Sequence, residues 1–422
     1  MHIPKNKDIL AYLQQSTMYE VNLRQYTPEG TIRAFQSHLP RLQQMGVNVL
    51  WFMPVHPIGI QNRKGSLGSY YSVKDYTDIN PEYGTREDFK HLVTQAHALG
   101  MKVIIDWVAN HAAWDNVWTS THPEYFKRDE QGQFLSPYDW TDVIQIDHAN
   151  ETAHQALRDA MCYWVKEFDI DGFRADLAHL TPLPFWVKAR EQCAQIKAGL
   201  IWLAETEDVH YFDAFDVAYA WKWMHRTEKM IKEQRPVQSM IEVLHEQKHA
   251  YPENALELFF TTNHDENSWN GTEKEKYGIY CDALTAFCFV YPWSVPLIYS
   301  GQEISNNKRL AFFDKDALHW PFDLEKEKLY TRLSAFRKVM RCTHELHFQH
   351  AGEKILSMVR GTEEKIWLLI NFDEKEIQID AEFFPLAVPC GDVMSGEVVK
   401  AKSSLVLKPG EWRMFVSQVK EG

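Results

Sequence analysis

The sequence predicts an α/β fold: a (β/α)8 (TIM) barrel with a short insertion after its third strand and a C-terminal antiparallel β-domain. Short apolar runs alternate with longer helical patterns from about residue 18 to 343, which is typical of parallel α/β folds. From about residue 345 the pattern changes to short alternating runs such as KIWLLINF and WRMFVSQV, which are typical of antiparallel strands.

Eight apolar runs are the expected barrel strands. Their predicted ranges are Met18–Asn22, Val47–Phe52, Lys102–Asp106, Ile170–Arg174, Leu200–Glu205, Ala214–Ala218, Leu258–Thr262 and Val295–Ser300. The stretch between the third and fourth runs is rich in Trp, Pro, Asp and Tyr and has no helical period. We therefore predict a barrel over 1–111 and 149–343, an inserted loop domain over 112–148, and a β-sandwich over 344–422.

Local signals place two of the helices between these strands. Thr85 followed by Asp88 predicts a capping box, and Gly100 predicts the end of that helix just before the third strand. Thr181 and Pro182 predict a second helix with Thr181 as N-cap and Pro182 as its first residue, running to about Lys197.

Composition excludes several classes of partner. The net charge of −13 argues against a nucleic-acid ligand, because phosphate binding needs clustered Lys and Arg. No run approaches the roughly 18 apolar residues of a membrane span, and the N-terminus has no apolar stretch of signal-peptide length. The six cysteines form no C-x-x-C pair, so neither a zinc site nor a disulfide framework is expected. A cytoplasmic enzyme is the simplest expectation.

Ionisable residues follow four of the predicted strands. The segments are DWVANH (106–111), DGFRADLAH (171–179), LAE (203–205) and TTNHD (261–265). Taken singly, a strand-end Asp is more often the N-cap of the next helix, and a strand-end Glu can pair with an Arg. In a barrel, however, the C-terminal strand ends meet on one face, where the chemistry of such folds lies. Four polar clusters on that face therefore predict an active site.

These four motifs, in this order, resemble those of the α-amylase family, glycoside hydrolase family 13. SYYSVKDYTDINPEYGT (69–85) and VPLIYSGQE (295–303) resemble further segments of that family, and the likeness covers about residues 18–343. It implies a retaining hydrolase that cleaves α-glucosidic, mainly α-1,4, bonds in malto-oligosaccharides through a covalent glycosyl-enzyme. Its expected partner is an oligosaccharide, and no cofactor is required.

The resemblance also implies roles for individual residues. Asp176 is the expected nucleophile, Glu205 the general acid/base and Asp265 the stabiliser of the transition state. The expected substrate-binding residues are Tyr71, His111, Arg174, His264 and, less specifically, Arg309, which is otherwise an ordinary exposed Arg. Such chemistry needs one ionised and one protonated carboxyl group, so their environments must separate the two pKa values. Arg174, two residues before Asp176 on a strand, points to the same side and favours the charged nucleophile.

The chain departs from the family in two places. Leu177-Ala178-His179-Leu180 lacks both the Lys-His pair usual in endo-acting α-amylases and the Asn-Glu pair usual in cyclodextrin-degrading relatives. The insertion is short, and a structural Ca²⁺ is implied only if Asn110 and Asp147 supply oxygen ligands. Four aromatic residues of the insertion either line sugar subsites or form the core of the loop domain; they are Trp114, Trp118, Tyr138 and Trp140.

Two alternatives remain open at this stage. In an α-glucosyltransferase of the same fold, a different acceptor would intercept the glycosyl-enzyme. In a non-catalytic sugar-binding relative the carboxylates would typically be lost, whereas this chain keeps all three.

Overall fold

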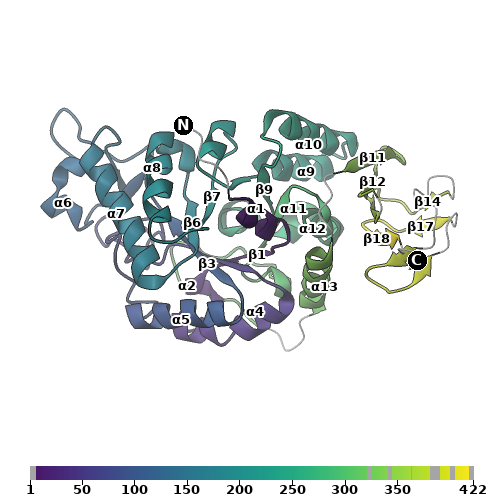
Figure 1. Cartoon of the computed structure of the whole chain (residues 1–422), viewed down its shortest axis with the longest axis horizontal. Coiled ribbons are helices and arrows are strands. Elements are labelled where there is room, and N and C mark those ends of the chain that lie inside the picture. The colour runs from purple at the N-terminus through teal and green to yellow at the C-terminus, as the bar shows by residue number, and fades with distance from the viewer. Residues whose placement is uncertain are drawn as a thin grey trace.

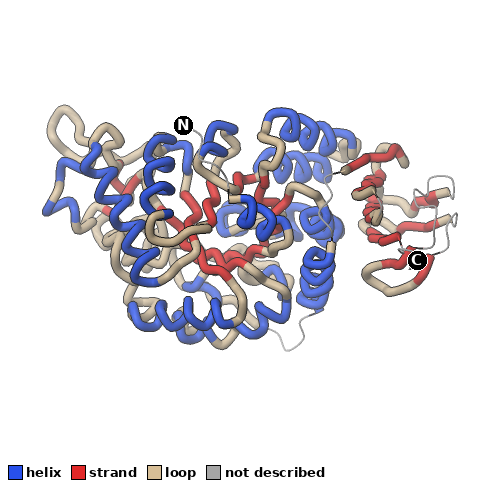
Figure 2. Tube along the Cα trace, in the orientation of Figure 1, coloured by secondary structure: helices blue, strands red, loops and turns tan. Residues whose placement is uncertain are grey.

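The computed structural model describes residues 6–320, 325–340, 345–362, 364–380, 390–399 and 404–417. Eight parallel strands close into a barrel in the order β1-β10-β9-β8-β7-β6-β3-β2, so that each barrel strand lies beside the next along the chain (Figures 1 and 2). The strands are β1 Met18–Val21, β2 Val49–Phe52, β3 Lys102–Trp107, β6 Gly172–Ala175, β7 Ile201–Ala204, β8 Val217–Tyr219, β9 Leu256–Phe259 and β10 Ser294–Tyr299. The predicted barrel is confirmed. The predicted ranges for β8 and β9 are displaced by up to three residues, because the buried runs 214–216 and 260–262 lie outside the hydrogen-bonded ladder.

Helices surround the barrel on its outer face (Figure 1). The longer ones are α1 Lys7–Gln14, α4 Leu39–Met45, α5 Arg86–Ala98, α7 Glu151–Phe168, α8 Leu183–Ala194, α9 Trp221–Lys232, α10 Gln238–Ala250, α12 Cys281–Val290 and α13 Glu325–Val339; α2 Leu23–Tyr26, α3 Ile32–Gln36 and α11 Glu273–Tyr277 are short. The capping box of α5 is present as predicted: Thr85 Oγ1 accepts from the Asp88 N–H, and the Asp88 carboxylate accepts from the Thr85 N–H.

The predicted start of α8 is wrong. Thr181 is extended, its side chain caps nothing, and the helix begins at Leu183. Residues 178–180 form a single 3-10 turn after the end of β6, and the Tyr211 hydroxyl then donates to the Thr181 carbonyl oxygen at 3.0 Å. Pro182 therefore occupies the N-cap position, one residue later than predicted, and it has no side-chain oxygen with which to cap the helix. The helix also ends earlier than predicted, at Ala194.

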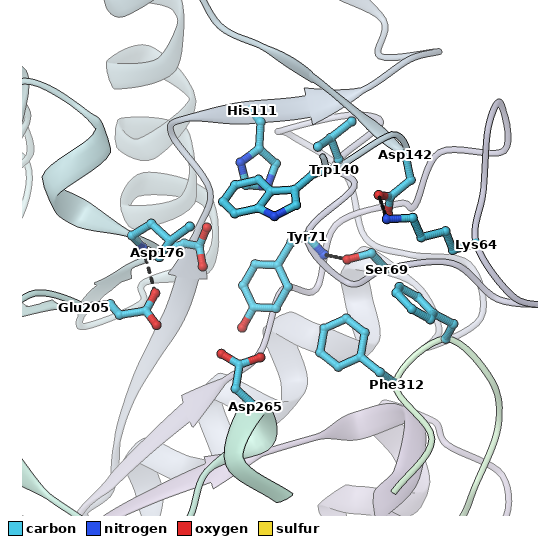
Figure 3. Close-up of a pocket in the computed structure, with 13 residues that line it drawn as sticks. Lys64, Ser69, Tyr71, His111, Trp140, Asp142, Asp176, Glu205, Asp265 and Phe312 are labelled. Atoms are coloured by element: carbon cyan, nitrogen blue, oxygen red, sulfur yellow. Dashed lines mark hydrogen bonds and ion pairs between the residues drawn. The ribbon is translucent and has the colours of Figure 1, made fainter. Parts of the chain in front are cut away.

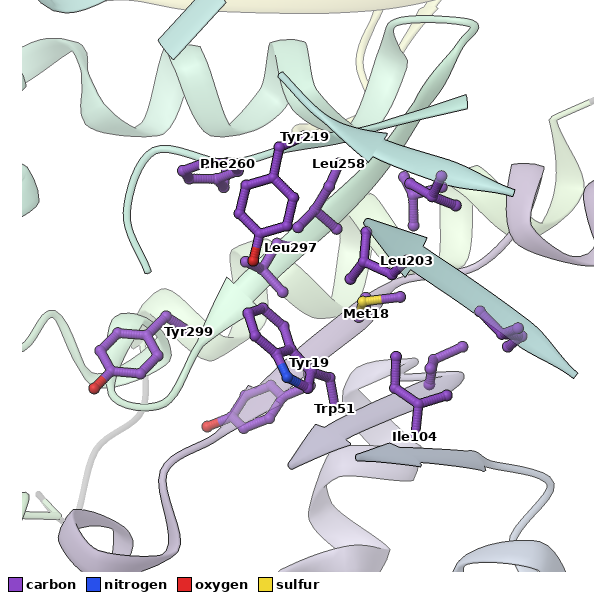
Figure 4. Packing of buried hydrophobic residues seen from close by; sticks show 14 of the residues in the cluster. Met18, Tyr19, Trp51, Ile104, Leu203, Tyr219, Leu258, Phe260, Leu297 and Tyr299 are labelled. Carbon is purple, nitrogen blue, oxygen red and sulfur yellow. The ribbon is translucent and has the colours of Figure 1, made fainter. Parts of the chain in front are cut away.

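Apolar side chains fill the lower part of the barrel. Met18, Ile104, Leu203, Leu258 and Leu297 come from five different strands and gather between them (Figure 4). Such a filled interior is what an eight-stranded barrel requires, because its lumen is only wide enough for side chains. The polar site described below therefore lies on top of a packed core.

The insertion after β3 carries a two-stranded antiparallel sheet of β4 His111–Ala113 and β5 Val143–Gln145, with α6 Trp118–Thr121 between them. It lies at the end of the molecule opposite the C-terminal strands (Figure 1).

The C-terminal strands form an antiparallel domain. A six-stranded sheet has the order β11-β12-β13-β18-β15-β16, and β14 pairs with β17 in a second sheet. Along β13, Leu368 and Ile370 join the barrel's core cluster, while Trp367 and Leu369 face a second core that also contains Leu407 of β17. This alternation attaches one face of the sheet to the barrel and covers the other with the second sheet. The strands are β11 Leu346–His350, β12 Ile355–Arg360, β13 Ile366–Asn371, β14 Ile377–Ile379, β15 Cys390–Asp392, β16 Val398–Val399, β17 Leu405–Leu407 and β18 Trp412–Ser417.

Among the described residues, the longest apolar stretches in helices fall short of what a membrane-crossing helix needs.

Candidate active site

A pocket of about 290 Å³ opens at the C-terminal ends of the barrel strands (Figure 3). All three predicted catalytic carboxylates line it, together with the predicted binding residues Tyr71 and His111. The lining residues are Lys64, Ser69, Tyr71, His111, Trp140, Asp142, Val143, Asp176, Leu177, Glu205, Asp265, Phe312 and Phe313. The structure thus brings together residues spread over about 250 positions of the sequence, as expected for a site at barrel strand ends.

Asp176 and Glu205 directly follow the adjacent strands β6 and β7. In the ladder Arg174 is opposite Leu203 and Ala175 is opposite Ala204, so the next pair along both strands is Asp176 and Glu205. Gly172 permits this close pairing: it has a φ of 147°, and a Cβ there would lie 1.9 Å from the Ile201 carbonyl oxygen. Neighbouring parallel strands lie about 4.8 Å apart, so the two carboxyl groups leave the barrel close together.

The turn after Asp176 links the two carboxylates. Leu177 has a left-handed backbone with a φ of 39°, which is rare for a residue with a branched side chain. In this conformation its N–H donates to Glu205 Oε2 at 2.8 Å. Unusual backbone conformations of this kind concentrate at functional sites. The backbone of the residue after one carboxylate therefore fixes the position of the other.

Arg174 is fully buried beneath the pocket and contacts three carboxylates. Its Nη1 donates to Asp106 Oδ1 at 2.9 Å and to Asp176 Oδ1 at 3.0 Å. Its Nη2 lies 2.8 Å from Glu205 Oε2, and its Nε donates to the Tyr219 hydroxyl at 3.1 Å. The sequence-based expectation that Arg174 lies beside Asp176 is met, but the same guanidinium also contacts Glu205. It therefore favours the ionised form of both groups.

Burial opposes that effect. Burial raises the pKa of Asp176 well above its ordinary range, Arg174 lowers it, and the neighbouring Glu205 raises it again. Burial likewise raises the pKa of Glu205, against the lowering effect of Arg174. Asp106 and Glu20 are also buried, so four buried carboxyl groups face two cations, Arg174 and His264. This imbalance favours a proton on one of the carboxyl groups, which is what general acid catalysis requires.

A hydrogen-bond chain runs from the top of β1 to Asp106. Glu20 contacts Nδ1 of His264, and His264 Nε2 lies 2.6 Å from the Tyr71 hydroxyl. That hydroxyl donates to Asp106 Oδ2 at 3.1 Å. Because a hydroxyl has one proton, His264 must be the donor to Tyr71, so both of its nitrogens carry protons. Sequence reasoning missed Glu20, although a Glu inside a buried strand, on the same face as Met18, was the available signal.

His111 lines the pocket, whereas His264 is buried and does not. The two histidines are expected to carry different charges at neutral pH. Burial by itself disfavours the charged form, but Asp265 and Glu20 raise the pKa of His264 to about 9. Burial lowers the pKa of His111 to about 4. Since the unfolded value is about 6.5, the stability that His264 contributes is fully present below pH 6.5 and lost as pH rises to about 9. The contribution of His111 is present above pH 6.5 and lost as pH falls to about 4.

Nitrogen-15 NMR of histidine-labelled protein tests this expectation, with His264→Gln and His111→Gln used to assign the signals. At pH 7 the His264 ring should show two protonated nitrogens and the His111 ring only one. A His264 ring that titrates near pH 6.5 would contradict the hydrogen-bond chain.

The remaining predicted residues lie at different distances from this centre. Asp265 lines the pocket, and its Oδ2 is 3.4 Å from His264 Nε2. Arg309 is not among the lining residues: it is half-exposed, and its Nε pairs with Glu275 at 2.9 Å. The structure therefore places Arg309 as a surface ion-pair residue, and nothing in its contacts points it into the pocket.

Of the four aromatic residues of the insertion, some line the pocket and others belong to the core. Trp140 lines the pocket, 5.5 Å from the His111 ring, and the ring of the exposed Tyr138 lies 5.1 Å from the Trp140 ring. Trp118 stacks on the buried Tyr76 and belongs to the core. Trp114 donates from Nε1 to the Thr141 carbonyl oxygen. Phe312 and Phe313 also line the pocket. The sequence did not predict them as site residues, because they lie in an irregular loop with no periodic pattern.

The two residues considered for calcium do not form a cation site. The Asn110 side chain donates to His111 Nδ1 at 3.3 Å, and Asp147 Oδ1 accepts from the Ala149 N–H at 3.1 Å. Asp147 lines a separate surface hollow together with Lys127 and Arg128, whose positive charges disfavour a metal ion. Within the described part of the chain no group of three or more His, Cys, Asp or Glu side chains converges as metal ligands would. The residues present do not fit Ca²⁺.

Comparison with known proteins identifies related sequences and structures. The family model for the α-amylase catalytic domain matches residues 12–137. α-Amylase 2 of Dictyoglomus thermophilum is 25% identical over 95% of this chain, which spans 73% of that protein. An α-1,4-glucan:maltose-1-phosphate maltosyltransferase of Pseudomonas aeruginosa is 34% identical, but over only 38% of this chain and 27% of its own length.

A solved structure matches nearly the whole chain. The crystal structure of a noncanonic maltogenic α-amylase from Thermotoga neapolitana superposes with a TM-score of 0.87 at 30% identity, covering 96% of this chain and 99% of its own. Together with the barrel, the C-terminal β-domain and the three pocket carboxylates, this match shows that the chain belongs to the α-amylase family of glycoside hydrolases.

Proposed function

We propose that this protein is a retaining hydrolase of α-1,4-glucosidic bonds in malto-oligosaccharides. The observation that carries the proposal is the placement of Asp176 and Glu205 at paired positions on adjacent strands, facing one pocket with Asp265. Retaining glycosidases need their two carboxyl groups about 5–5.5 Å apart, whereas inverting enzymes leave about 6.5–9.5 Å for a water. Strand ends about 4.8 Å apart support the shorter separation.

The reaction then proceeds in two steps. Asp176 attacks the anomeric carbon while Glu205 gives its proton to the glycosidic oxygen, so the bond to the leaving sugar breaks as the bond to Asp176 forms. Glu205 next takes a proton from water, and that water displaces Asp176 from the anomeric carbon. Asp265, which lines the same pocket, stabilises the positive charge that develops on the sugar ring.

Neighbouring side chains position the sugar in this proposal. Tyr71 lies between the carboxylates and the opposite wall of the pocket, so its ring can stack on the apolar face of the sugar (Figure 3). His111, neutral, would hydrogen-bond a sugar hydroxyl. His264, whose two ring nitrogens are bonded to Glu20 and Tyr71, would hold the Tyr71 ring in place. Arg174 contacts no sugar directly, because Asp106, Asp176 and Glu205 surround its guanidinium.

The stereochemistry of the product tests the proposal most directly. NMR of the first sugar released from an α-linked malto-oligosaccharide should show the α-anomer before mutarotation. At high sugar concentration some of the glycosyl-enzyme should transfer to sugar in place of water. If the β-anomer appears first, water displaces the leaving group in one step and Asp176 acts as a base.

Transfer to an acceptor other than water is the second candidate, since part of the chain is similar to a maltosyltransferase whose name includes maltose-1-phosphate. A phosphate group would need unpaired cations that line the pocket, and Arg174 is buried among carboxylates. Of the described residues that line the pocket, only Lys64 is cationic, and its ammonium is paired with Asp142. The pocket therefore favours neutral acceptors, water or sugar. All three carboxylates line the pocket, which disfavours a non-catalytic role.

A further inference from the structure

The pocket has Asp176 and Glu205 at one end and is bounded at the other end by a wall that contains the Lys64–Asp142 ion pair. Asp176 and Glu205 lie at one end, Lys64 and Asp142 at the other, and Tyr71 between them (Figure 3). Three separate segments form the wall: the loop 59–68 after β2, the stretch before β5 in the insertion, and the loop 311–314 after β10. We refer to Lys64, Asp142 and Phe313 as the end wall.

An ion pair holds two of these segments together. Lys64 Nζ lies 2.8 Å from Asp142 Oδ1, and the Asp142 side chain is 7% exposed. The Ser72 hydroxyl donates to the Asp142 carbonyl oxygen at 3.2 Å, which fixes the backbone of the insertion at this point. Asp142 is therefore a rigid partner, and its carboxylate holds the ammonium of Lys64 at this end of the pocket.

The loop that carries Lys64 is fastened to the third segment. Ser66 donates from its N–H and its hydroxyl to Asp314 Oδ1, at 2.8 and 2.6 Å. The Leu67 N–H donates to the Phe313 carbonyl oxygen at 2.9 Å. Gly65 has a φ of 62°, and a Cβ there would lie 2.5 Å from Phe313 Cβ, so the two backbones touch. These contacts keep the loop from swinging away when a sugar enters.

The position of Glu205 determines which end of the substrate faces the end wall, and this step rests on the proposed function. Glu205 protonates the departing oxygen, so the leaving sugar lies on its side of Asp176. The sugar that becomes bound to Asp176, and any units before it, must extend the other way, toward the end wall. In an α-1,4-linked chain that direction leads to the non-reducing end.

We propose that the end wall makes the enzyme exo-acting: it admits only the free non-reducing end of an α-glucan and releases a short sugar of fixed length. The ammonium of Lys64 and the carboxylate of Asp142 would hydrogen-bond the terminal hydroxyls, where a longer chain would continue. The pocket volume of about 290 Å³, at the low end of the roughly 300–1,000 Å³ usual for small-molecule sites, supports a short donor segment.

Maltotetraose with and without a bulky acetal on its non-reducing sugar tests this inference. The wild-type kcat/KM for the capped substrate should be at least about tenfold lower than for the free one, because the cap meets a fixed wall. Lys64→Ala should narrow that difference to about threefold or less. If the Phe313 ring still blocks the pocket in Lys64→Ala, the double variant Lys64→Ala/Phe313→Ala should remove the remaining difference in kcat/KM between the two substrates.

Lys74→Ala is the matched control. Lys74 also pairs with an aspartate of the insertion, Asp115, and its side chain is 36% exposed against 38% for Lys64, but it does not line the pocket. The Lys74→Ala variant should keep the wild-type preference for the free substrate over the capped one. Equal wild-type rates on both substrates, or an unchanged preference in both Lys64 variants, would overturn the end wall.

Binding separates this inference from the proposed function. The affinities of capped and free maltotetraose for Glu205→Gln should differ by the same factor as the rates, without any turnover. If the wild type hydrolyses no α-glucan but Glu205→Gln still prefers the free end, the proposed function fails and the wall stands. If hydrolysis occurs but Glu205→Gln binds both sugars equally, the wall fails alone.

Discussion

Asp176→Asn and Glu205→Gln are each expected to lower kcat on malto-oligosaccharides by at least about a thousandfold while the protein stays folded. Each substitution keeps the size of the side chain and removes one chemical role. Asn at 176 still accepts from Arg174 Nη1, and Gln at 205 still accepts from the Leu177 N–H. Circular dichroism and melting temperature should therefore change little. A variant that kept more than a tenth of the wild-type kcat would reassign that residue.

The leaving group distinguishes the two roles. An α-glucosyl fluoride needs no proton to depart, so Glu205→Gln should recover much of the rate of the first step on this substrate, whereas Asp176→Asn should not. Asp208→Asn serves as control: Asp208 lies three residues beyond Glu205, is exposed and does not line the pocket. Its side chain caps the His210 N–H, and Asn caps equally well. Equal recovery by both pocket variants would contradict the assignment.

Much of the fold follows from local signals in the sequence. Eight buried runs, separated by helical patterns, predict the barrel because parallel strands covered on both faces are apolar throughout. The strand-end position of Asp176, Glu205 and Asp265 then predicts that they meet, since the barrel aligns all strand ends on one face. The structure brings all three to one pocket.

The rest depends on contacts between distant segments. The end wall joins Lys64, Asp142 and Phe313, which lie in irregular loops without a shared pattern. Thr181 looks like an N-cap locally, but the helix begins at Leu183, and the hydroxyl of Tyr211, 30 residues away, donates to the Thr181 carbonyl oxygen. The left-handed conformation of Leu177 likewise gives no signal, because the sequence has no glycine at that position to indicate it.

Arg174→Met is expected to destabilise the fold by about 3–5 kcal/mol near neutral pH, because it leaves three buried carboxylates without their cation. Arg174→Lys should keep much of the stability but lower kcat at least about tenfold, since a point charge cannot span Asp106, Asp176 and Glu205 as the planar guanidinium does. Unfolding by urea and steady-state kinetics measure the two effects. A Met variant as stable and as active as the wild type would show that the network is dispensable.

The pH dependence separates a loss of charge balance from a loss of packing. Burial raises the pKa values of Asp106, Asp176 and Glu205, and Arg174 lowers them. Removal of the Arg174 guanidinium must therefore raise these pKa values further. A carboxyl group with a raised folded pKa binds more protons when folded, so its contribution to stability is full below the unfolded value of about 4 and lost as pH rises through the folded pKa. The stability deficit of Arg174→Met should therefore be small at pH 5 and largest at pH 8.

Arg190→Met supplies the comparison: Arg190 is buried and pairs with a single carboxylate, Asp216, at 2.7 Å, so the stability deficit of this variant should vary less with pH. A stability deficit of Arg174→Met that is equal at pH 5 and pH 8 would mean that the guanidinium acts through packing against Trp51 and Tyr219, and not by balancing the charge of the buried carboxylates.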